Sequence, residues 1–470
     1  MWDSVSVPLW FVVVLAALAI LAILDRILIP SVRWALQRRA NRAIEQLNTR
    51  LKLHIQPFKV TRRKLLIDSL LFDPEVRQEI ETYAREAKVP PDVALQRARR
   101  YAREIVPSFN AYAYFGIATR LAKRLSQMLF RVRLGYTNDD ALRNLDPDSA
   151  VVFVINHRSN LDYVLVTYIA SSSSALSYAV GEWANAWPLS SFFRSMGAYF
   201  IRRDSRGNTL YRRILSRYVH NATQSGVVQA MFPEGGLSRD GALRPPKLGL
   251  LNYMVSGFDP QGARDVVFIP VGVNYDRVLE DRMLTGAIAD KSKGSKAFRF
   301  KPSALIKFVL NGIWLGMRGK WYRYGYACVS FGEPFSLRNY LSNHGIDFRA
   351  MRKEQREQEI KRLGDELMKA VGEAVPALPV SLVATVILEA KDHPLTKFEL
   401  MGRVHDLIGH LEKHGAYTHI PRADREYAID VGLRMLLLRG FLIEKDGTYI
   451  KNEDDIILLR YYANSIAHLT

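Results

Sequence analysis

Short β-rich apolar runs alternating with longer helical stretches constrain the fold of this chain more than any other feature. Four such runs follow residue 149, at Ala150–Ile155, Val227–Phe232, Val266–Val273 and Ala327–Phe331. Helical segments of 15 or more residues separate them, which is the pattern of a largely parallel sheet with helices on both faces. Functional sites in such sheets form where strands end and loops begin. The sequence therefore predicts a mixed, largely parallel α/β fold with its site in these loops.

Charge and composition narrow the class of protein. The chain has 470 residues, 48% of them hydrophobic, and a net charge of +19, so it is long and apolar enough to fold into two or three domains. Residues 376–470 carry 11 basic and 13 acidic side chains, so the positive excess lies upstream. That excess indicates an anionic partner: nucleic acid, a membrane surface or a phosphorylated substrate. The lone cysteine, Cys328, excludes an intramolecular disulfide framework and a multi-cysteine metal site.

An uncharged stretch near the N-terminus predicts a membrane anchor. Val5–Leu24 contains 20 residues without a charge, which as a helix measures about 30 Å, the thickness of the hydrocarbon layer. A cleaved signal peptide is the alternative, but the basic and small-residue regions that flank such a peptide are missing; a buried soluble helix is another. Arg26 and Arg33 follow the stretch and only Asp3 precedes it, so the positive-inside rule predicts that the rest of the chain is cytoplasmic.

Changes in the pattern of apolar and polar residues along the chain predict four regions: an anchor at 1–29, a helical membrane-associated region at 30–132, an α/β domain at 133–375 and a C-terminal domain at 376–470. In the second region, Asp73 and Pro74 mark a helix start. Its Lys and Arg clusters beside Tyr112 and Leu121 either face water or meet anionic lipid head groups. The last region reads as three helices and a hairpin across Asp446–Gly447, a winged-helix-like order, but its net negative charge argues against DNA binding.

The loop after the first β-run holds a candidate acid-base pair. Residues 156–162 read NHRSNLD, so His157 precedes Asp162 by five positions. A neutral imidazole is a competent base near pH 7, and a carboxylate bonded to its other nitrogen fixes its tautomer. The two side chains can meet if the histidine precedes a helix whose first turns contain the aspartate. A second His-x4-Asp, His419 to Asp424, follows no β-run and is interpreted as accidental.

Two further loops carry groups suited to a phosphorylated ligand. Gly197–Arg203 (GAYFIRR) ends in adjacent arginines, and Phe232–Arg239 (FPEGGLSR) is followed by Lys247. Guanidinium groups make forked bonds to phosphate oxygens, and glycines let backbone N–H groups approach a ligand closely. Either loop taken alone is equally compatible with an ordinary charged surface.

These three segments and Ile269–Asp276 (IPVGVNYD), in this order, resemble the four motif blocks of the glycerolipid acyltransferases. The sequence looks nearest to the bacterial membrane-bound glycerol-3-phosphate acyltransferases, whose closing segment residues 459–466 also resemble. Leu237 departs from the third block, which often has arginine there. The resemblance implies a glycerolipid acyltransferase fold. It also implies acyl transfer from acyl-CoA or acyl carrier protein to the sn-1 hydroxyl of glycerol 3-phosphate, giving lysophosphatidate, the first step of phospholipid synthesis, without a metal or cofactor.

The resemblance also assigns roles to individual residues. His157 would be the general base and Asp162 would orient it. Backbone N–H groups near Gly235 and Gly236 are candidates for stabilising the oxyanion. The implied substrate-binding residues are Arg202, Arg203, Glu234, Gly235, Gly236, Ser238, Arg239 and Lys247. With the anchor, these roles predict a single-pass inner-membrane enzyme whose catalytic domain is cytoplasmic and contacts anionic lipids, but not nucleic acid.

Two alternatives remain open. A 1-acylglycerol-3-phosphate acyltransferase would use the same blocks on a different acceptor. A membrane-tethered nucleic-acid-binding protein would explain the charge and the anchor, but not four ordered blocks, and the chain lacks a strand of interleaved aromatic and basic residues.

Overall fold

The structure, a computed structural model of the chain, describes residues 53–170, 175–181, 189–202, 205, 207–289 and 324–470. Contacts divide the chain into two units, Met1–His54 and Ile55–Thr470, and every element named below lies in the second. The predicted anchor Val5–Leu24 falls outside the described residues. Among the helices that the structure describes, none combines the length and the hydropathy needed to cross a bilayer.

Within the described residues, a mixed sheet of eight strands has the spatial order β1-β7-β6-β2-β5-β3-β4, with β8 paired to β6. Neighbouring strands run parallel except that β7 and β8 are antiparallel to β6. The predicted mixed, largely parallel sheet is therefore confirmed. The strands are β1 Arg131–Thr137, β2 Ala150–Ile155, β3 Ser177–Gly181, β4 Tyr199–Ile201, β5 Gln229–Met231, β6 Val266–Tyr275, β7 Tyr326–Phe331 and β8 Phe335–Ser336.

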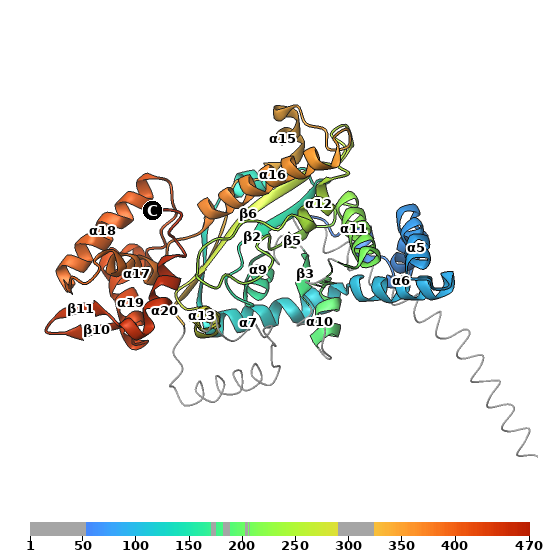
Figure 1. Cartoon of the computed structure of the whole chain (residues 1–470). Helices are drawn as coiled ribbons and strands as arrows, with labels where there is room; N and C mark the ends of the chain where they lie inside the picture. The colour runs from blue at the N-terminus through green and yellow to red at the C-terminus, as the bar shows by residue number, and fades with distance from the viewer. Residues whose placement is uncertain (1–52, 171–174, 182–188, 203–204, 206, 290–323) are drawn as a thin grey trace, which may run out of the picture. The chain divides into compact units, whose positions relative to one another are not determined.

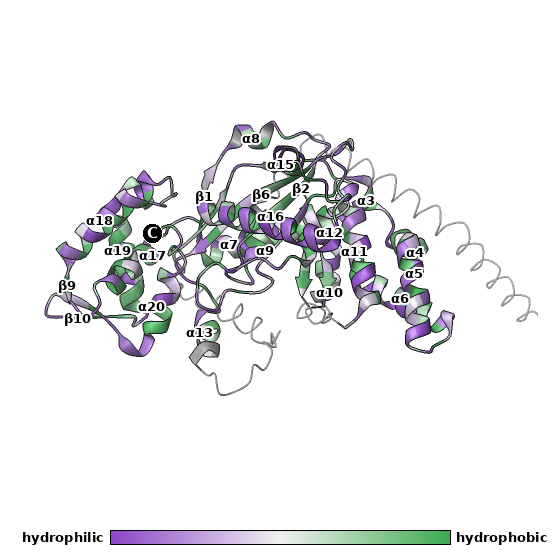
Figure 2. Ribbon diagram, turned by 45° about the horizontal axis from the view of Figure 1, so that its top comes forward, coloured by the Kyte–Doolittle hydropathy of each residue, from purple (hydrophilic) through white to green (hydrophobic). Residues whose placement is uncertain are grey.

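The central strands are apolar because helices cover them on both faces. Every residue of β2 and β6 is buried, and Val152 of β2 lies opposite Phe268 of β6 in a parallel register. A strand covered on both faces gains nothing from alternating polar and apolar residues. Figure 2 shows this contrast as green along β2 and β6 and a mixture of purple and green on the neighbouring helix α16.

Helices form one layer on each face of the sheet (Figure 1). Helix α16 packs on β6 and β2, with α12 beside it, and α7 packs against α9 on the opposite face. The helices of this region are α7 Thr119–Leu129, α8 Asp139–Arg143, α9 Asp162–Ala170, α10 Leu189–Ser195, α11 Thr209–Gln224, α12 Gly249–Val255, α13 Asp281–Ala289, α15 Leu337–His344 and α16 Lys353–Ala374.

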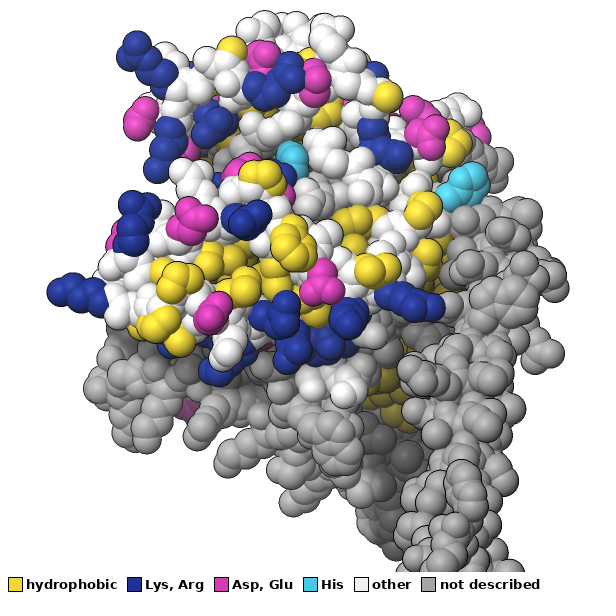
Figure 3. Space-filling view, turned by 90° about the vertical axis from the view of Figure 1, so that its right-hand side faces the viewer, with side chains coloured by type: hydrophobic (Ala, Val, Ile, Leu, Met, Phe, Trp, Pro, Cys, Tyr) yellow, Lys and Arg dark blue, Asp and Glu magenta, His cyan; other side chains and the backbone are white. Residues whose placement is uncertain are grey.

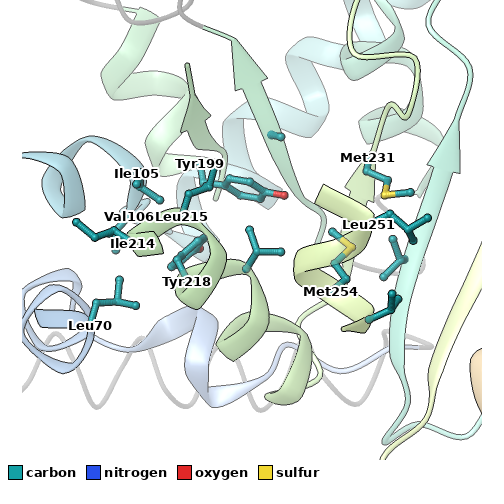
Figure 4. Close-up of a cluster of buried hydrophobic side chains, with 14 of the residues drawn as sticks. Leu70, Ile105, Val106, Tyr199, Ile214, Leu215, Tyr218, Met231, Leu251 and Met254 are labelled. Carbon is teal, nitrogen blue, oxygen red and sulfur yellow. The ribbon is translucent and has the colours of Figure 1, made fainter. Parts of the chain in front are cut away.

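A hydrophobic core joins the sheet to the helices on the α12 side. Figure 4 shows Met231 of β5 near Leu251 and Met254 of α12, and Leu215 and Tyr218 of α11 near Tyr199. Burying a side chain of this size contributes about 1.5–3 kcal/mol to folding. This core therefore fixes the strand ends from which the functional loops emerge.

The region before the sheet is helical, as predicted. The carboxylate of Asp73 accepts hydrogen bonds from the amides of Glu75 and Val76, so it caps α5 at the predicted helix start. Helix α11 packs on α5 and α6 and joins this region to the sheet. The elements are α3 Pro57–Val60, α4 Arg63–Phe72, α5 Pro74–Glu86, α6 Pro91–Ile105 and the π-helix η2 Tyr112–Ala118.

The C-terminal region has the predicted order of three helices and a hairpin. Asp446 and Gly447 both have positive φ, 51° and 74°, as the two central residues of a tight hairpin turn require. A short strand, β9, pairs with β11 to complete a three-stranded sheet. The elements are α17 Pro379–Glu389, β9 Leu395–Thr396, α18 Lys397–Lys413, η4 Pro421–Ala423, α19 Arg425–Leu438, β10 Leu442–Lys445, β11 Thr448–Lys451, η5 Glu453–Asp455 and α20 Ile456–Ala463.

Candidate active site

The loop that follows β2 is anchored by an asparagine side chain. Asn156 donates from Nδ2 to the Val273 carbonyl at 2.9 Å and accepts at Oδ1 from the Val273 amide at 2.7 Å. These two hydrogen bonds to β6 take the place of the backbone hydrogen bonds between the strands where β2 ends. The chain then turns away from the sheet at His157, and its next helix begins at Asp162.

His157 and Asp162 meet as their spacing predicted. Nδ1 of His157 lies 2.9 Å from Oδ2 of Asp162, and both side chains are buried. A carboxylate accepts hydrogen bonds, so Nδ1 carries the ring proton and Nε2 keeps its lone pair. Within the described residues Nε2 makes no hydrogen bond, and it is not among the enclosed polar atoms. The ring is therefore oriented with a basic nitrogen available.

Four donors converge on the Asp162 carboxylate. Besides the His157 ring, Oδ2 accepts the amides of Arg158 at 2.7 Å and Ser159 at 3.0 Å, and Oδ1 accepts the Tyr275 hydroxyl at 2.6 Å. Burial and the neighbouring Asp162 charge raise the pKa of Tyr275 well above its usual value, so its hydroxyl stays a donor. Hydrogen bonds from this many donors stabilise the carboxylate anion in a fully buried position.

Aromatic rings fix the imidazole plane. The ring of Phe232 lies 4.4 Å from the His157 ring between centroids, and Tyr163 meets the same imidazole edge-on at 5.5 Å. Packing of this kind restricts ring rotation. The imidazole is therefore held by two rings and one carboxylate.

Glu234 comes from the loop after β5 and bonds to the backbone of the histidine. Its Oε1 accepts the His157 amide at 2.9 Å, and its Oε2 is enclosed without a partner among the described residues. Burial raises the pKa of Glu234 to about 7, although that hydrogen bond and the charges of His157, Arg158 and Arg244 oppose the rise. An enclosed oxygen without a partner is costly, and it marks a position that a ligand hydroxyl would satisfy.

The glycines of this loop differ in what their amides do. The Gly235 amide donates to the Phe232 carbonyl at 3.0 Å with φ at +64°, so it closes a turn. This bond removes Gly235 from the expected oxyanion donors. No acceptor is recorded for the Gly236 amide within the described part of the chain, so Gly236 remains a candidate. Ser238 is buried and donates its amide to the His157 carbonyl at 3.0 Å.

The arginines and the lysine predicted to bind phosphate differ in their partners and in their exposure. Arg202, at the end of β4, makes a two-fold ion pair with Glu104 at 2.8 and 2.7 Å, so its guanidinium is already occupied. Arg203 lies outside the described residues. Arg239 is exposed and has no recorded partner among the described residues, whereas Lys247 is exposed and lies 3.5 Å from the Gly235 carbonyl. The structure therefore places Arg239 and Lys247 on the loop of Glu234, and it brings Arg202 into contact with Glu104 rather than with this loop.

Three residues that support the pair were not singled out from the sequence. Tyr275 bonds to Asp162, and Glu280 accepts from the Ser159 hydroxyl at 2.8 Å and the Asn160 amide at 3.1 Å. Arg158 is buried directly after His157. Tyr275 lies in the fourth block, which ends the strand beside β2, so its position in the motif was the available signal; no pattern marked Glu280.

An apolar pocket adjoins the pair. Its lining comes from the end of α7, the start of α9 and the end of β6: Leu125, Ser126, Leu129, Phe130, Leu161, Val164, Leu165 and Tyr275. Tyr275 belongs both to this lining and to the hydrogen bond on Asp162. Apolar walls therefore reach the immediate surroundings of the catalytic candidates.

Comparisons with known proteins agree with the resemblance of the motifs. Residues 135–274 match the family described as Acyltransferase, and residues 315–470 match the glycerol-3-phosphate acyltransferase C-terminal region. A glycerol-3-phosphate acyltransferase of Aeromonas hydrophila subsp. hydrophila is 30% identical over 428 residues, 87% of this chain and 50% of the relative. The chain thus spans about half the length of this curated relative.

A solved structure also matches. The crystal structure of the 1-acyl-sn-glycerophosphate acyltransferase PlsC from Thermotoga maritima is 18% identical, with a TM-score of 0.30 over 65% of this chain and 97% of that one. The two family matches are more informative, because they cover the sheet with its motif loops and the C-terminal region separately. With both regions present and in order, the chain is similar to glycerol-3-phosphate acyltransferases in its sheet with the motif loops and in its C-terminal region.

Proposed function

We propose that the protein transfers a fatty acyl group from an acyl thioester to the sn-1 hydroxyl of glycerol 3-phosphate, giving lysophosphatidate. The observation that carries the proposal is the oriented imidazole of His157. Its Nδ1 is bonded to Asp162, and its Nε2 is unbonded among the described residues. An alcohol is a poor nucleophile at neutral pH unless a base removes its proton as the new bond forms.

The reaction needs one proton carrier. Nε2 of His157 takes the hydroxyl proton while the oxygen attacks the thioester carbonyl carbon. Asp162 stabilises the imidazolium that results. When the tetrahedral intermediate collapses, its carbon–sulfur bond breaks and the imidazolium returns the proton to the departing thiolate. The products are an ester and a free thiol, and His157 is neutral again.

Substrate positioning falls to the loop after β5. Glu234 offers its unpartnered Oε2 to a hydroxyl of the acceptor, and the Gly236 amide is available to the oxyanion. Arg239 and Lys247 provide positive charge on the same loop for the phosphate. Arg202 would have to exchange its Glu104 partner for phosphate to act in binding.

We also propose that the protein works at the bacterial inner membrane as a single-pass protein. The uncharged stretch Val5–Leu24 supports this placement. The face that carries α4–α6 shows hydrophobic side chains interspersed with Lys and Arg (Figure 3). Leu65 and Phe72 of α4 are 58% and 73% exposed. Apolar and cationic side chains together suit a surface of anionic lipids.

The test is an acyl-transfer assay on the full chain in detergent. Thiol release is measured with acyl-CoA and, separately, with acyl carrier protein, each with and without glycerol 3-phosphate. We expect thiol release that depends on glycerol 3-phosphate. Lysophosphatidate is offered in parallel, and faster release with it would establish the alternative acceptor. No release with either acceptor, together with salt-sensitive oligonucleotide binding, would refute the enzyme.

A further inference from the structure

The buried guanidinium of Arg158 connects the catalytic loop to the C-terminal end of the described chain. Its Nη1 donates to the Gly241 carbonyl, and its Cζ lies 4.8 Å from the ring centroid of Tyr461, in α20. Nε and Nη2 are enclosed without partners in the part of the chain that the structure describes. Burying a charge with so few hydrogen bonds is costly. The aromatic face of Tyr461 is therefore a main compensation for that charge.

The segment around α20 also holds the loop that follows Glu234. Asn464 donates from Nδ2 to the Asp240 carbonyl at 2.9 Å, and Asp240 accepts from the Ser238 hydroxyl at 3.1 Å. Gly241 has a φ of +87°, and a Cβ there would lie 1.9 Å from the Tyr461 carbonyl oxygen. The two backbones are therefore in such close contact that only glycine fits.

The same segment is fixed to the fourth block from its other side. Ser465 accepts from Asn274 Nδ2 at 3.2 Å, and the Tyr462 hydroxyl accepts the Val278 amide at 3.1 Å. Tyr462 also bonds to the buried Asp281, which pairs with Arg439 at 2.7 Å. The segment is hydrogen-bonded both to the loop after Glu234 and to the end of the fourth block. Tyr461 is therefore held in place where it contacts Arg158.

We infer that Tyr461 and Arg158 are positioning residues for the acyl-transfer site, and that the C-terminal region contributes to catalysis by holding the backbone of His157 through them. The inference rests on the proposed function. Arg158 follows His157 directly, and its amide is one of the donors on Asp162. A guanidinium held between Tyr461 and Gly241 fixes that amide, and a displacement of about 1 Å at such a group can cost 100-fold in rate.

The kinetic test compares Tyr461→Leu with Tyr461→Phe. The leucine removes the aromatic face, whereas phenylalanine keeps the ring and removes only a hydroxyl that is enclosed without a partner among the described residues. We expect Tyr461→Leu to lower kcat by about 10–100-fold, with KM for glycerol 3-phosphate changed less than about 3-fold, because positioning acts in the transition state. Phenylalanine should restore the parental kcat.

A double-variant cycle separates positioning from stability. Arg158→Leu removes a costly buried charge, so its thermal midpoint should stay near that of the parent while its kcat falls. Adding Tyr461→Leu to Arg158→Leu should then cause no further loss of kcat, because the contact is already gone. Additive losses, or a kcat that falls only in proportion to the folded fraction, would overturn the inference.

Hydrogen exchange gives a readout that does not depend on activity. Peptides 156–162 and 234–242 contain the amides bonded to Glu234, Asp162 and the His157 carbonyl. Both should exchange faster in Tyr461→Leu than in the parent or Tyr461→Phe. Faster exchange in a chain that transfers no acyl group would contradict the proposed function alone. An active parent whose exchange and kcat are unchanged by Tyr461→Leu would contradict only this inference.

Discussion

The chain contains two His-x4-Asp sequences, and the histidine and aspartate side chains meet in the first but not in the second. In the first, Asp162 turns its carboxylate back to the ring of His157 at 2.9 Å. In the second, Asp424 accepts the Tyr427 amide at 3.0 Å and caps its own helix, α19. The ring of His419 packs edge-on against Tyr326 instead, at 4.9 Å between centroids.

The residues between the two members of each motif account for the difference. In the first motif, the amides of Arg158 and Ser159 point at the carboxylate and draw it toward the histidine. In the second, the chain passes through the turn η4, where Arg422 and Ala423 have φ values of 61° and 54°. Spacing alone therefore does not make a pair; the direction of the intervening amides does.

The largest expected difference between the motifs follows from removing each histidine. His157→Ala should lower kcat by about ten-thousand-fold, because the base is lost and only binding and oxyanion stabilisation remain. His419→Ala should leave kcat within about 3-fold. Thiol release with glycerol 3-phosphate measures both, and equal losses would refute the distinction between the two motifs.

The aspartates should separate in kind as well as in size. Asp162→Asn should lower kcat by about a thousand-fold, because an amide no longer fixes the histidine tautomer as a carboxylate does. Asp424→Ala should instead lower the free energy of unfolding by about 1 kcal/mol through loss of the helix cap. Kinetics and chemical denaturation of both variants provide the check; a catalytic defect in Asp424→Ala would contradict it.

Tyr275→Phe tests the hydrogen bond that the aspartate of the first motif accepts from a tyrosine outside the motif. It removes one of four donors from Asp162 while keeping the ring that packs on Phe130. We expect kcat to fall by about ten-fold with KM unchanged, as for other groups that orient a catalytic residue. An unchanged kcat would mean that the other three donors suffice.

Acid provides the smallest contrast, and it concerns the second motif. Burial, together with the nearby charge of Arg133, lowers the pKa of His419 to about 4. The unfolded chain therefore binds a proton at this position more readily, and stability is lost as pH falls from about 6.5 toward 4. His419→Phe should reduce the loss of unfolding free energy between pH 7 and pH 5 by about 1–2 kcal/mol. Denaturant titrations at both pH values test this, and an equal loss of unfolding free energy in parent and variant would contradict it.

Much of this architecture follows from local patterns. The strands β2, β5, β6 and β7 lie at the predicted apolar runs, and the C-terminal hairpin turns at the predicted Asp446–Gly447. Four of the described strands, β1, β3 and the two-residue strands β8 and β9, were not predicted. β1 falls at the end of the stretch interpreted as helical and includes Arg131 and Arg133, and its pairing with β7, nearly 200 residues later in the chain, has no local signal. β3 is short and was passed over between two recognised motifs.

The features of the site likewise divide into those with a local sequence signal and those that depend on distant residues. The contact between His157 and Asp162 could be expected because strand, loop and helix are local features. The pairing of Arg202 with Glu104 could not, since the two residues are 98 positions apart and come from different elements. The closed turn at Gly235 depends on a single backbone torsion that the sequence does not specify. Long-range partners decide which predicted cations remain available.

The contact between Arg158 and Tyr461 has a consequence for biosynthesis. About 300 residues separate the two along the polypeptide. At translation rates of roughly 5–20 residues per second, the ribosome needs about 15–60 seconds to cover that distance. During that interval a nascent chain that already displays the histidine loop lacks its contact with Tyr461, so under the proposed function acyl transfer would begin only after α20 has emerged and docked.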